Sequence, residues 1–344
     1  MRNLNFWRDR LSADQLFAET TGCFKLMPVE MQALAVFAGV WVIGVACGLP
    51  ISVPDVVSIQ YIQQGFLVPL LCASLLQILI AIFTGWHNLR QQRSDPFLML
   101  KLLPVMVVTI FIYFNLKAWM PLVNPRMYDE VYQSIDLSLW PLVKLFSDAR
   151  AAIADGFESY TSLSIDFAYL QLYLIMFFLS PCIHGLVDAP RRQRQVVFGA
   201  CLIMLVGGIS YWIAPAAGPF LYRQGLNIEG LSAQQYMYGL FLQVRNTGHI
   251  PTGYFSAPIA AMPSLHVAHA LFFTLCAARS ARVLLIFYLP ILFWITIESV
   301  ASGWHYLIDL PAGALLAVLC LYLVIRWLPE VDKHRSSTSS TNNL

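Results

Sequence analysis

Charged residues are scarce in this chain. Lys, Arg, Asp and Glu together make up 12% of its 344 residues, whereas 58% are hydrophobic and the mean hydropathy is +0.64. A soluble globular domain carries about 25% charged residues, so the composition excludes that class. The net charge of +2 is too small to indicate a nucleic-acid partner. The composition instead indicates a protein that crosses a membrane several times.

Cysteines are few, and they are not arranged as a disulfide framework. Six of the seven lie within or beside apolar segments, where a thiol behaves as a small hydrophobic group, and Cys23 precedes the first such segment. We therefore expect no structural disulfide and no zinc site. No other metal and no cofactor is expected either.

The N-terminal segment lacks the features of a signal peptide. Residues 1–31 contain acidic and aromatic residues but no apolar core with a small-residue cleavage site. We expect this segment to be an amphipathic cytoplasmic lead. Residues 328–344 are mostly polar, and we expect them to form a disordered cytoplasmic tail.

Long apolar runs, by contrast, are abundant. A helix needs about 20 apolar residues to cross the hydrocarbon core of a bilayer. Eight segments meet this requirement, at roughly 32–53, 65–86, 102–123, 166–187, 196–215, 260–278, 283–301 and 305–327. Because backbone polar groups in a bilayer must satisfy one another, helices are the expected spanning structure. We therefore predict an all-α membrane bundle of about eight transmembrane helices.

The positive charges indicate how this bundle is oriented. If the N-terminus is cytoplasmic, 15 of the 21 Lys and Arg residues fall on the cytoplasmic side, as the positive-inside rule demands. Both termini are then cytoplasmic, as in an integral protein of a bacterial inner membrane or another cell membrane, and loops 124–165 and 216–258 face outward. Helical spacing of apolar residues predicts one or two amphipathic helices on the outer surface within 127–165. Asp129 and Asp136 in that segment are most simply solvated.

Two polar stretches interrupt the apolar segments, although an ionisable group at the bilayer centre costs about 2.5 to 3.5 kcal/mol. The first, MPSLHVAHA, contains Ser264, His266 and His269. The second, ESVASGWHYLIDLPAG, contains Glu298, Ser299, Ser302, His305 and Asp309. The predicted orientation puts both stretches at the outer ends of their helices, so they can meet.

His305 and Asp309 are four residues apart, a spacing that puts two side chains on one face of a helix. The carboxylate can then accept a hydrogen bond from one ring nitrogen and leave the other nitrogen free to attack. His266, from another helix, can give a proton to a leaving group. Two histidines and a carboxylate suit phosphoryl transfer. The structural alternatives are a capping turn with a buried His266 and a polar pair that only ties two helices.

These residues carry a resemblance to a known family. PSLH, followed about forty residues later by GWHYLIDLPAG, resembles the second and third signatures of the type 2 phosphatidic acid phosphatase superfamily, P-S-G-H and S-R-x5-H-x3-D. The Leu of PSLH and the H-Y-x-x-D ending resemble most the inositolphosphotransferase branch, which includes inositol phosphorylceramide synthase. The resemblance covers roughly residues 102–327. It implies a six-helix catalytic core there, preceded by two additional transmembrane helices over 32–101.

The resemblance also implies roles for individual residues. His305 would be the nucleophile that forms a phosphohistidine, and His266 would be the general acid. Asp309 would orient His305, and Ser264 would bind the phosphate. The substrate would be a lipid phosphate or phospholipid, and the acceptor would be water or the hydroxyl of a lipid or sugar alcohol.

Two features of the family are missing as written. The positions of the Ser-Arg pair hold Glu298 and Ser299. The first signature, K-x6-R-P, is absent from the outer end of the fifth apolar segment, which reads YWIAPAAGPFLYRQ. A bound phosphate dianion needs a cation. Arg223 is our first candidate and Arg245 our second, because loop 216–258 contains no other Lys or Arg.

Residues beside the two motifs are candidates for supporting roles: His269, Glu298, Ser299, Gly303 and Tyr306. His269 lies three residues beyond His266, on about the same face, and a supporting or packing role is favoured. Glu298 either faces the site or pairs with an arginine from a loop.

The sequence therefore predicts an integral membrane lipid phosphotransferase or phosphatase with an extracytoplasmic site. A pure lipid phosphate phosphatase would use the same residues with water as the acceptor. A lipid transporter on the same scaffold would need acidic residues deep in several spans, and apart from Glu298 and Asp309 the apolar segments hold few. A catalytically inactive lipid-binding scaffold is the remaining alternative, since the family arginine is missing.

Overall fold

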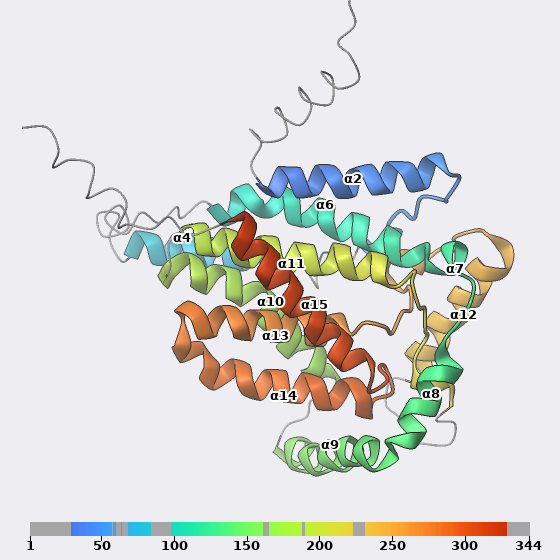
Figure 1. Cartoon of the computed structure of the whole chain (residues 1–344). Coiled ribbons are helices and arrows are strands. Elements are labelled where there is room, and N and C mark those ends of the chain that lie inside the picture. Colours follow the sequence, from blue (N-terminus) through green and yellow to red (C-terminus); the bar gives the residue numbers. More distant parts are fainter. Residues whose placement is uncertain are drawn as a thin grey trace, which may run out of the picture.

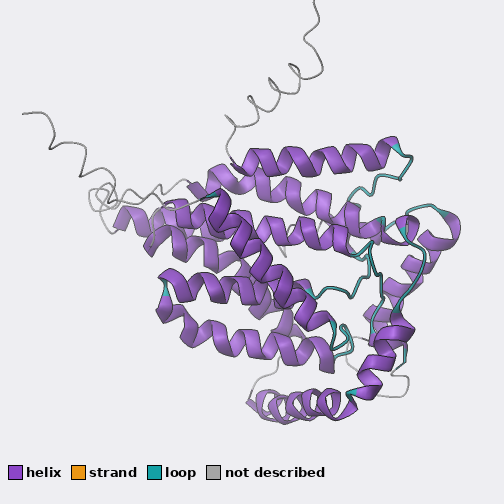
Figure 2. Cartoon of the chain, in the orientation of Figure 1, coloured by secondary structure: helices purple, strands orange, loops and turns teal. Residues whose placement is uncertain are grey.

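The computed structural model describes most of the chain, namely residues 29–56, 58–59, 63, 68–83, 98–160, 165–187, 190–222 and 231–328. Within these ranges every regular element is a helix and no strand occurs (Figure 2). The predicted fold class, an all-α membrane bundle, is confirmed. Most of the predicted lead (1–28) and of the predicted tail (329–344) lies outside the described residues.

Six helices form the body of the bundle: α6 (Leu98–Ala118), α10 (Ile165–Val187), α11 (Pro190–Ser210), α13 (Leu265–Ser280), α14 (Leu285–Ala301) and α15 (Asp309–Trp327). The central helix is α13, which packs against α10, α11, α14 and α15 (Figure 1). Because neighbours surround it, α13 buries residues on all of its faces, as an apolar helix inside a bundle does.

Five stretches within the described residues are long and apolar enough to cross a membrane: Lys101–Ala118, Ala168–Gly185, Arg191–Ser210, Arg282–Ala301 and Asp309–Trp327. They fall on the third, fourth, fifth, seventh and eighth predicted segments. The sixth predicted segment holds α13, which has only 16 residues because the chain before Leu265 is a loop. Pro258 and Pro263 in that loop lack the N–H that a helix interior requires.

Two further helices, α2 (Val29–Ala46) and α4 (Val68–Phe83), lie on the outside of this body. α2 packs against α6, and α4 packs against α10 (Figure 1). The stretch after α2 is fixed to the end of α6, since Ser52 N donates to Asn115 Oδ1 at 2.9 Å and Trp119 Nε1 donates to the Pro50 carbonyl at 2.7 Å.

The segment between α6 and α10 forms the short helix α7 (Met120–Val123) and two amphipathic helices, α8 (Asp129–Ser138) and α9 (Trp140–Tyr160). α9 begins afresh after α8 because Pro141 is tolerated only in the first turn of a helix. α9 runs beside α14, while α8 lies at one end of the bundle (Figure 1).

The outer loop after α11 also contains helices. These are the 3-10 turn η2 (Pro219–Leu221), the helix α12 (Leu231–Thr247) and the 3-10 turn η3 (Tyr254–Ser256). A last 3-10 turn, η4 (Arg282–Leu284), joins α13 to α14. α8, α12 and the loop segments between α11 and α13 gather at one end of the bundle, where α13 and α15 begin (Figure 1). η4 lies at the opposite end of α13.

Glycines on neighbouring helices allow α13 to be approached closely. A Cβ on Gly207 of α11 would overlap the side chain of Leu265, and a Cβ on Gly313 of α15 would overlap the backbone carbonyl oxygen of Ser264. A backbone oxygen cannot swing away as the end of a side chain can, so Gly313 is the more constrained of the two. The close approach lets Ser264 N donate to the carbonyl oxygen of Asp309 at 3.2 Å.

We expect Gly313→Ala to destabilise the protein by about 1 to 3 kcal/mol, the usual cost of overpacking a well-filled contact. The matched control is Gly156→Ala on α9, where an added Cβ meets nothing within 4 Å. The control should be neutral or slightly stabilising, since Ala favours helix over Gly by about 1 kcal/mol. Denaturation of both variants in the same detergent checks this expectation, and equal midpoints would contradict it.

Candidate active site

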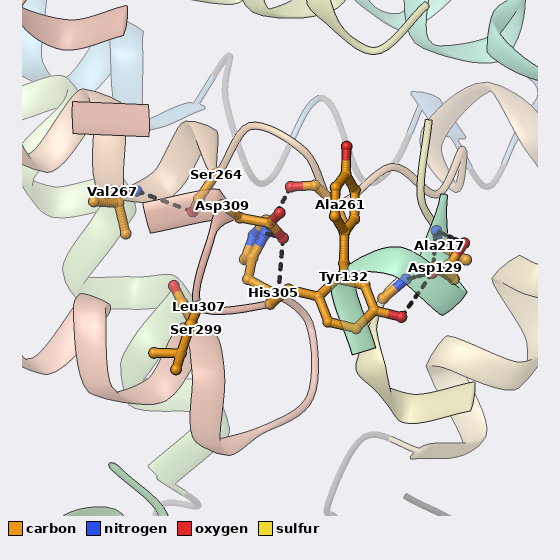
Figure 3. A network of polar contacts seen from close by, with 12 residues as sticks. Asp129, Tyr132, Ala217, Ala261, Ser264, Val267, Ser299, His305, Leu307 and Asp309 are labelled. Carbon is orange, nitrogen blue, oxygen red and sulfur yellow. Dashed lines mark hydrogen bonds and ion pairs between the residues drawn. The ribbon is translucent and has the colours of Figure 1, made fainter. Parts of the chain in front are cut away.

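His305 lies in the turn between α14 and α15, and Asp309 is the first residue of α15. Nδ1 of His305 is 2.8 Å from the carbonyl oxygen of Ala261 and 3.2 Å from Oδ2 of Asp309 (Figure 3). Because both acceptors surround one nitrogen, a neutral imidazole holds its proton on Nδ1 and its lone pair on Nε2. His305 is 6% exposed and Asp309 is fully buried. The surroundings therefore fix both the tautomer and the orientation of the ring.

This pair is made by a turn, whereas the spacing predicted two residues on one helical face. Gly303 has a φ of +76° and ends α14, as a left-handed glycine commonly does. The chain then reverses, and His305 N donates to the Ser299 carbonyl at 2.9 Å. Oδ2 of Asp309 also accepts from Tyr306 N at 2.9 Å. One carboxylate thus holds both the side chain of His305 and the backbone beside it.

Ser264 and His266 approach this turn from the start of α13. Ser264 is the N-cap of α13, and its Oγ accepts from Val267 N at 3.5 Å (Figure 3). The ring centres of His266 and His305 are 6.4 Å apart, close enough for one small group to contact both. The structure therefore brings together four of the predicted site residues, Ser264, His266, His305 and Asp309.

The ring of His266 is bordered by tyrosines of α10. The ring centres of Tyr173 and Tyr169 lie 4.5 and 5.2 Å from that of His266. Within the part of the chain that the structure describes, His266 has ring contacts but no hydrogen bond. The structural alternative, a capping turn, is therefore correct for Ser264, which caps α13. It does not account for His266, whose ring nitrogens stay available to another molecule.

His269 differs from His266 in being fully engaged by the protein. Its Nδ1 is 2.9 Å from the Leu265 carbonyl and 3.2 Å from the hydroxyl of Tyr173, and its Nε2 is 3.1 Å from the Ala200 carbonyl. His269 is 1% exposed. These contacts link α10, α11 and α13, so His269 helps to pack the helices around the site.

Glu298 pairs with an arginine, which was one of its two predicted arrangements. Nε of Arg150, on α9, lies 2.9 and 3.2 Å from the two carboxylate oxygens of Glu298. Glu298 is 1% exposed and Arg150 is 19% exposed, so the pair is partly buried. The neighbouring Ser299 has its Oγ 3.4 Å from the hydroxyl of Tyr169. An arginine is thus held next to the position where the family signature has one, but it comes from a different helix.

Of the two arginines proposed as phosphate ligands, the structure describes only Arg245. Arg223 lies outside the described residues. Arg245 is exposed in the last turn of α12, and it makes no contact with His266 or His305. Among the described residues, another cation lies near the site.

That residue is Lys117, in the last turn of α6, which the sequence analysis did not single out. Its Nζ lies 5.6 Å from the centre of the Tyr211 ring, and the lysine lies within electrostatic range of His266. The signal was present, because Lys117 is followed after six residues by Asn124 and Pro125, which matches K-x6-R-P except at the arginine. It was missed because the signature was sought after the fifth apolar segment rather than after the third.

The prediction that Asp129 and Asp136 are solvated is wrong. Their side chains are only 3% and 2% exposed. Asp129 accepts hydrogen bonds from the backbone of loop 214–218 and from Tyr306, and Asp136 Oδ1 accepts from Leu307 N at 2.9 Å. Burial raises the pKa of Asp129 above its usual value, and these donors oppose that rise. Both acids therefore belong to the surroundings of His305.

Comparison with known proteins places this geometry in a family. A family model described as the PAP2 superfamily matches residues 143–323, a span that runs from most of α9 through most of α15 and contains His266, His305 and Asp309. No curated protein and no solved structure matches the chain. The match covers more than half of the 344 residues and agrees with the signatures seen in the sequence. The chain belongs to the PAP2 superfamily, the type 2 phosphatidic acid phosphatases and their relatives.

Proposed function

We propose that this protein is an integral membrane lipid phosphotransferase that works through a phosphohistidine on His305. The observation that carries the proposal is the arrangement of Nδ1 between the Ala261 carbonyl and Asp309, with a second imidazole, His266, 6.4 Å away. A histidine whose proton is held on one nitrogen has a lone pair on the other, which is the requirement for a nucleophile. The PAP2 superfamily consists of phosphatases and phosphotransferases, so membership supports an enzyme of this type.

In the first step, Nε2 of His305 attacks phosphorus, the N–P bond forms and the bond from phosphorus to the leaving oxygen breaks. Protonated His266 gives its proton to that oxygen. Asp309 and the Ala261 carbonyl stabilise the positive imidazole ring of His305 through Nδ1. In the second step, an acceptor hydroxyl loses its proton to neutral His266 and attacks phosphorus, and the N–P bond breaks. No step uses a metal ion.

The negative charge of the phosphate needs partners in both steps. Lys117 lies beside Tyr211 and within electrostatic range of His266, and we assign it to the phosphate ahead of Arg245. Arg223 stays a second candidate. The start of α13 adds the favourable dipole of a helix N-terminus, and the Ser264 hydroxyl lies at that start.

The burial of the site supports transfer to an alcohol over hydrolysis. His305 and Asp309 are 6% and 0% exposed, so bulk water does not surround the reacting nitrogen. A lipid or sugar hydroxyl that enters with its own apolar surface can displace the remaining water. Lipid phosphate hydrolysis uses the same residues and is the alternative.

The distribution of arginines supports an extracytoplasmic site. His184, Arg192 and Arg279 line a small cavity between helices at the end of α13 opposite to Ser264 and His266. Positively charged ends of spanning helices favour the cytoplasmic side. The site then faces the outer side, together with α8 and the loops beside it.

We expect His305→Ala to lose essentially all turnover of a lipid phosphate, by more than about 10³-fold, since it removes the nucleophile. In His266→Ala, turnover of a substrate with a lipid alcohol as leaving group should fall about 10²- to 10⁴-fold, the usual contribution of a general acid. Turnover of an aryl phosphate by His266→Ala should fall far less, because its leaving group departs without a proton.

The matched control is His249→Ala, which removes an exposed loop histidine that contacts only Thr247. It should behave like the wild type with both substrates. Purified proteins assayed with a panel of labelled lipid phosphates, with and without a lipid alcohol, provide the measurement. Undiminished turnover in His305→Ala would contradict the proposed mechanism. Product that appears only with the alcohol would establish transfer rather than hydrolysis.

For Lys117→Gln we expect kcat/KM to fall about 10²- to 10³-fold, because one charged partner of the developing phosphate charge is lost. Lys117→Arg should retain part of the activity, since it keeps the charge. The control is Lys144→Gln on α9, an exposed lysine that pairs only with Asp148. Steady-state kinetics of the three variants test the assignment, and equal values for Lys117→Gln and Lys144→Gln would point to another cation.

A further inference from the structure

The face of α8 that points into the protein carries Asp129, Tyr132 and Asp136. Intervals of three and four residues put these side chains on one side of the helix. All three are buried, with exposed fractions of 3%, 7% and 2%. Their hydrogen bonds with Ala214, Ala217, Gly218, Tyr306 and Leu307 go to loops and to the turn before α15.

Asp129 is bound by three donors. Its Oδ1 accepts from the backbone N of Ala217 and of Gly218, each at 2.9 Å, and from the hydroxyl of Tyr306 at 2.9 Å (Figure 3). Gly218 has a φ of +133°, and a Cβ there would lie 2.9 Å from the Trp304 carbonyl. The loop that carries Ala217 therefore lies directly against the turn that carries His305, and Asp129 joins the two.

Asp136 and Tyr132 contact the same turn. Oδ1 of Asp136 accepts from Leu307 N at 2.9 Å. The Tyr132 ring lies 5.6 Å from that of Tyr306, and its hydroxyl donates to the Ala214 carbonyl at 3.2 Å. The two residues after His305 are thus each tied to α8, one through its side chain and one through its backbone.

A second route leads from α8 to the ring of His305. Next to Ala217, the carbonyl of Ala216 accepts from Ala261 N at 2.8 Å. The carbonyl of Ala261 in turn accepts from His305 Nδ1 at 2.8 Å. Asp129 is therefore connected to His305 in two ways. It binds Tyr306, the next residue, and through the loop at Ala216 and Ala217 it supports Ala261, one of the two acceptors of His305 Nδ1. These residues form a small apolar cluster of their own, centred on Tyr132, Ala216, Ala261 and Tyr306.

We propose that α8 is a positioning element for phosphoryl transfer, in which Asp129 and Asp136 hold His305 in its reactive orientation through Tyr306, Leu307 and Ala261. The inference rests on the proposed role of His305 as the nucleophile. Asp129 and Asp136 touch no reacting atom, so they are positioning residues and not catalytic ones. Their loss loosens the turn before α15 and leaves the packing of the long helices in place.

The test compares Asp136→Ala, Asp136→Asn and Tyr306→Phe with the control Glu130→Ala in the full-length protein. Glu130 is an exposed acid on the same helix. The readouts are kcat and KM for the lipid phosphate that the wild type turns over, and the thermal midpoint. We expect Asp136→Ala and Tyr306→Phe to lower kcat about 10- to 100-fold with little change in KM, since a displacement of about 1 Å can cost that much. Asp136→Asn keeps an oxygen for Leu307 N and should recover most of the rate.

The outcomes separate positioning from simple stability. Lower kcat at assay temperatures well below the midpoint, with recovery in Asp136→Asn, supports the proposal. If Asp136→Ala does not fold, the kcat of Tyr306→Phe tests the proposal instead, because this variant removes only the hydroxyl that donates to Asp129. Wild-type kcat in both, or losses that follow the thermal midpoint without recovery in Asp136→Asn, would overturn the positioning role while His305→Ala stays inactive. Wild-type protein that turns over no lipid phosphate would instead refute the proposed function, and the positioning role with it.

Discussion

The two hydrogen bonds at Nδ1 of His305 are the interaction on which the rest of the site depends. Their acceptors come from different parts of the chain: Ala261 lies 44 residues before His305, whereas Asp309 lies four residues after it and begins the next helix. They meet only because the starts of α13 and α15 lie side by side, joined by Ser264 N and the Asp309 carbonyl. The packing of the central helix thus determines which nitrogen of the imidazole carries the proton.

The sequence was sufficient to predict what depends on local pattern. Apolar runs give the bundle, and the interval between His305 and Asp309 gives a carboxylate beside an imidazole, although a turn and not a helix face produces the contact. The burial of Asp129 and Asp136 could not be predicted in this way. Their partners Ala217 and Leu307 are 88 and 171 residues away, and an acid in an amphipathic segment is solvated unless such distant donors reach it.

The source of positive charge illustrates a second limit of local patterns. The family signature puts an arginine six residues before the histidine, where this chain has Ser299, and the residue before it, Glu298, binds Arg150 of α9. Paired charges of opposite sign largely cancel at a distance, so this pair adds little net charge to the site. Lys117 comes from α6, and only the folded bundle shows that it lies beside Tyr211 and within electrostatic range of His266.

The contact between Gly313 and the Ser264 carbonyl also divides the site into a stiff and an adaptable wall. Where α13 meets α15, backbone lies against backbone, and no rotation of a side chain can widen the gap. Beside His266, the site is bordered instead by tyrosine rings of α10, whose hydroxyls contact Ser299 and His269. The loss of one such contact can move a ring, so a group that approaches His266 meets the part of the site that a side-chain substitution can reshape.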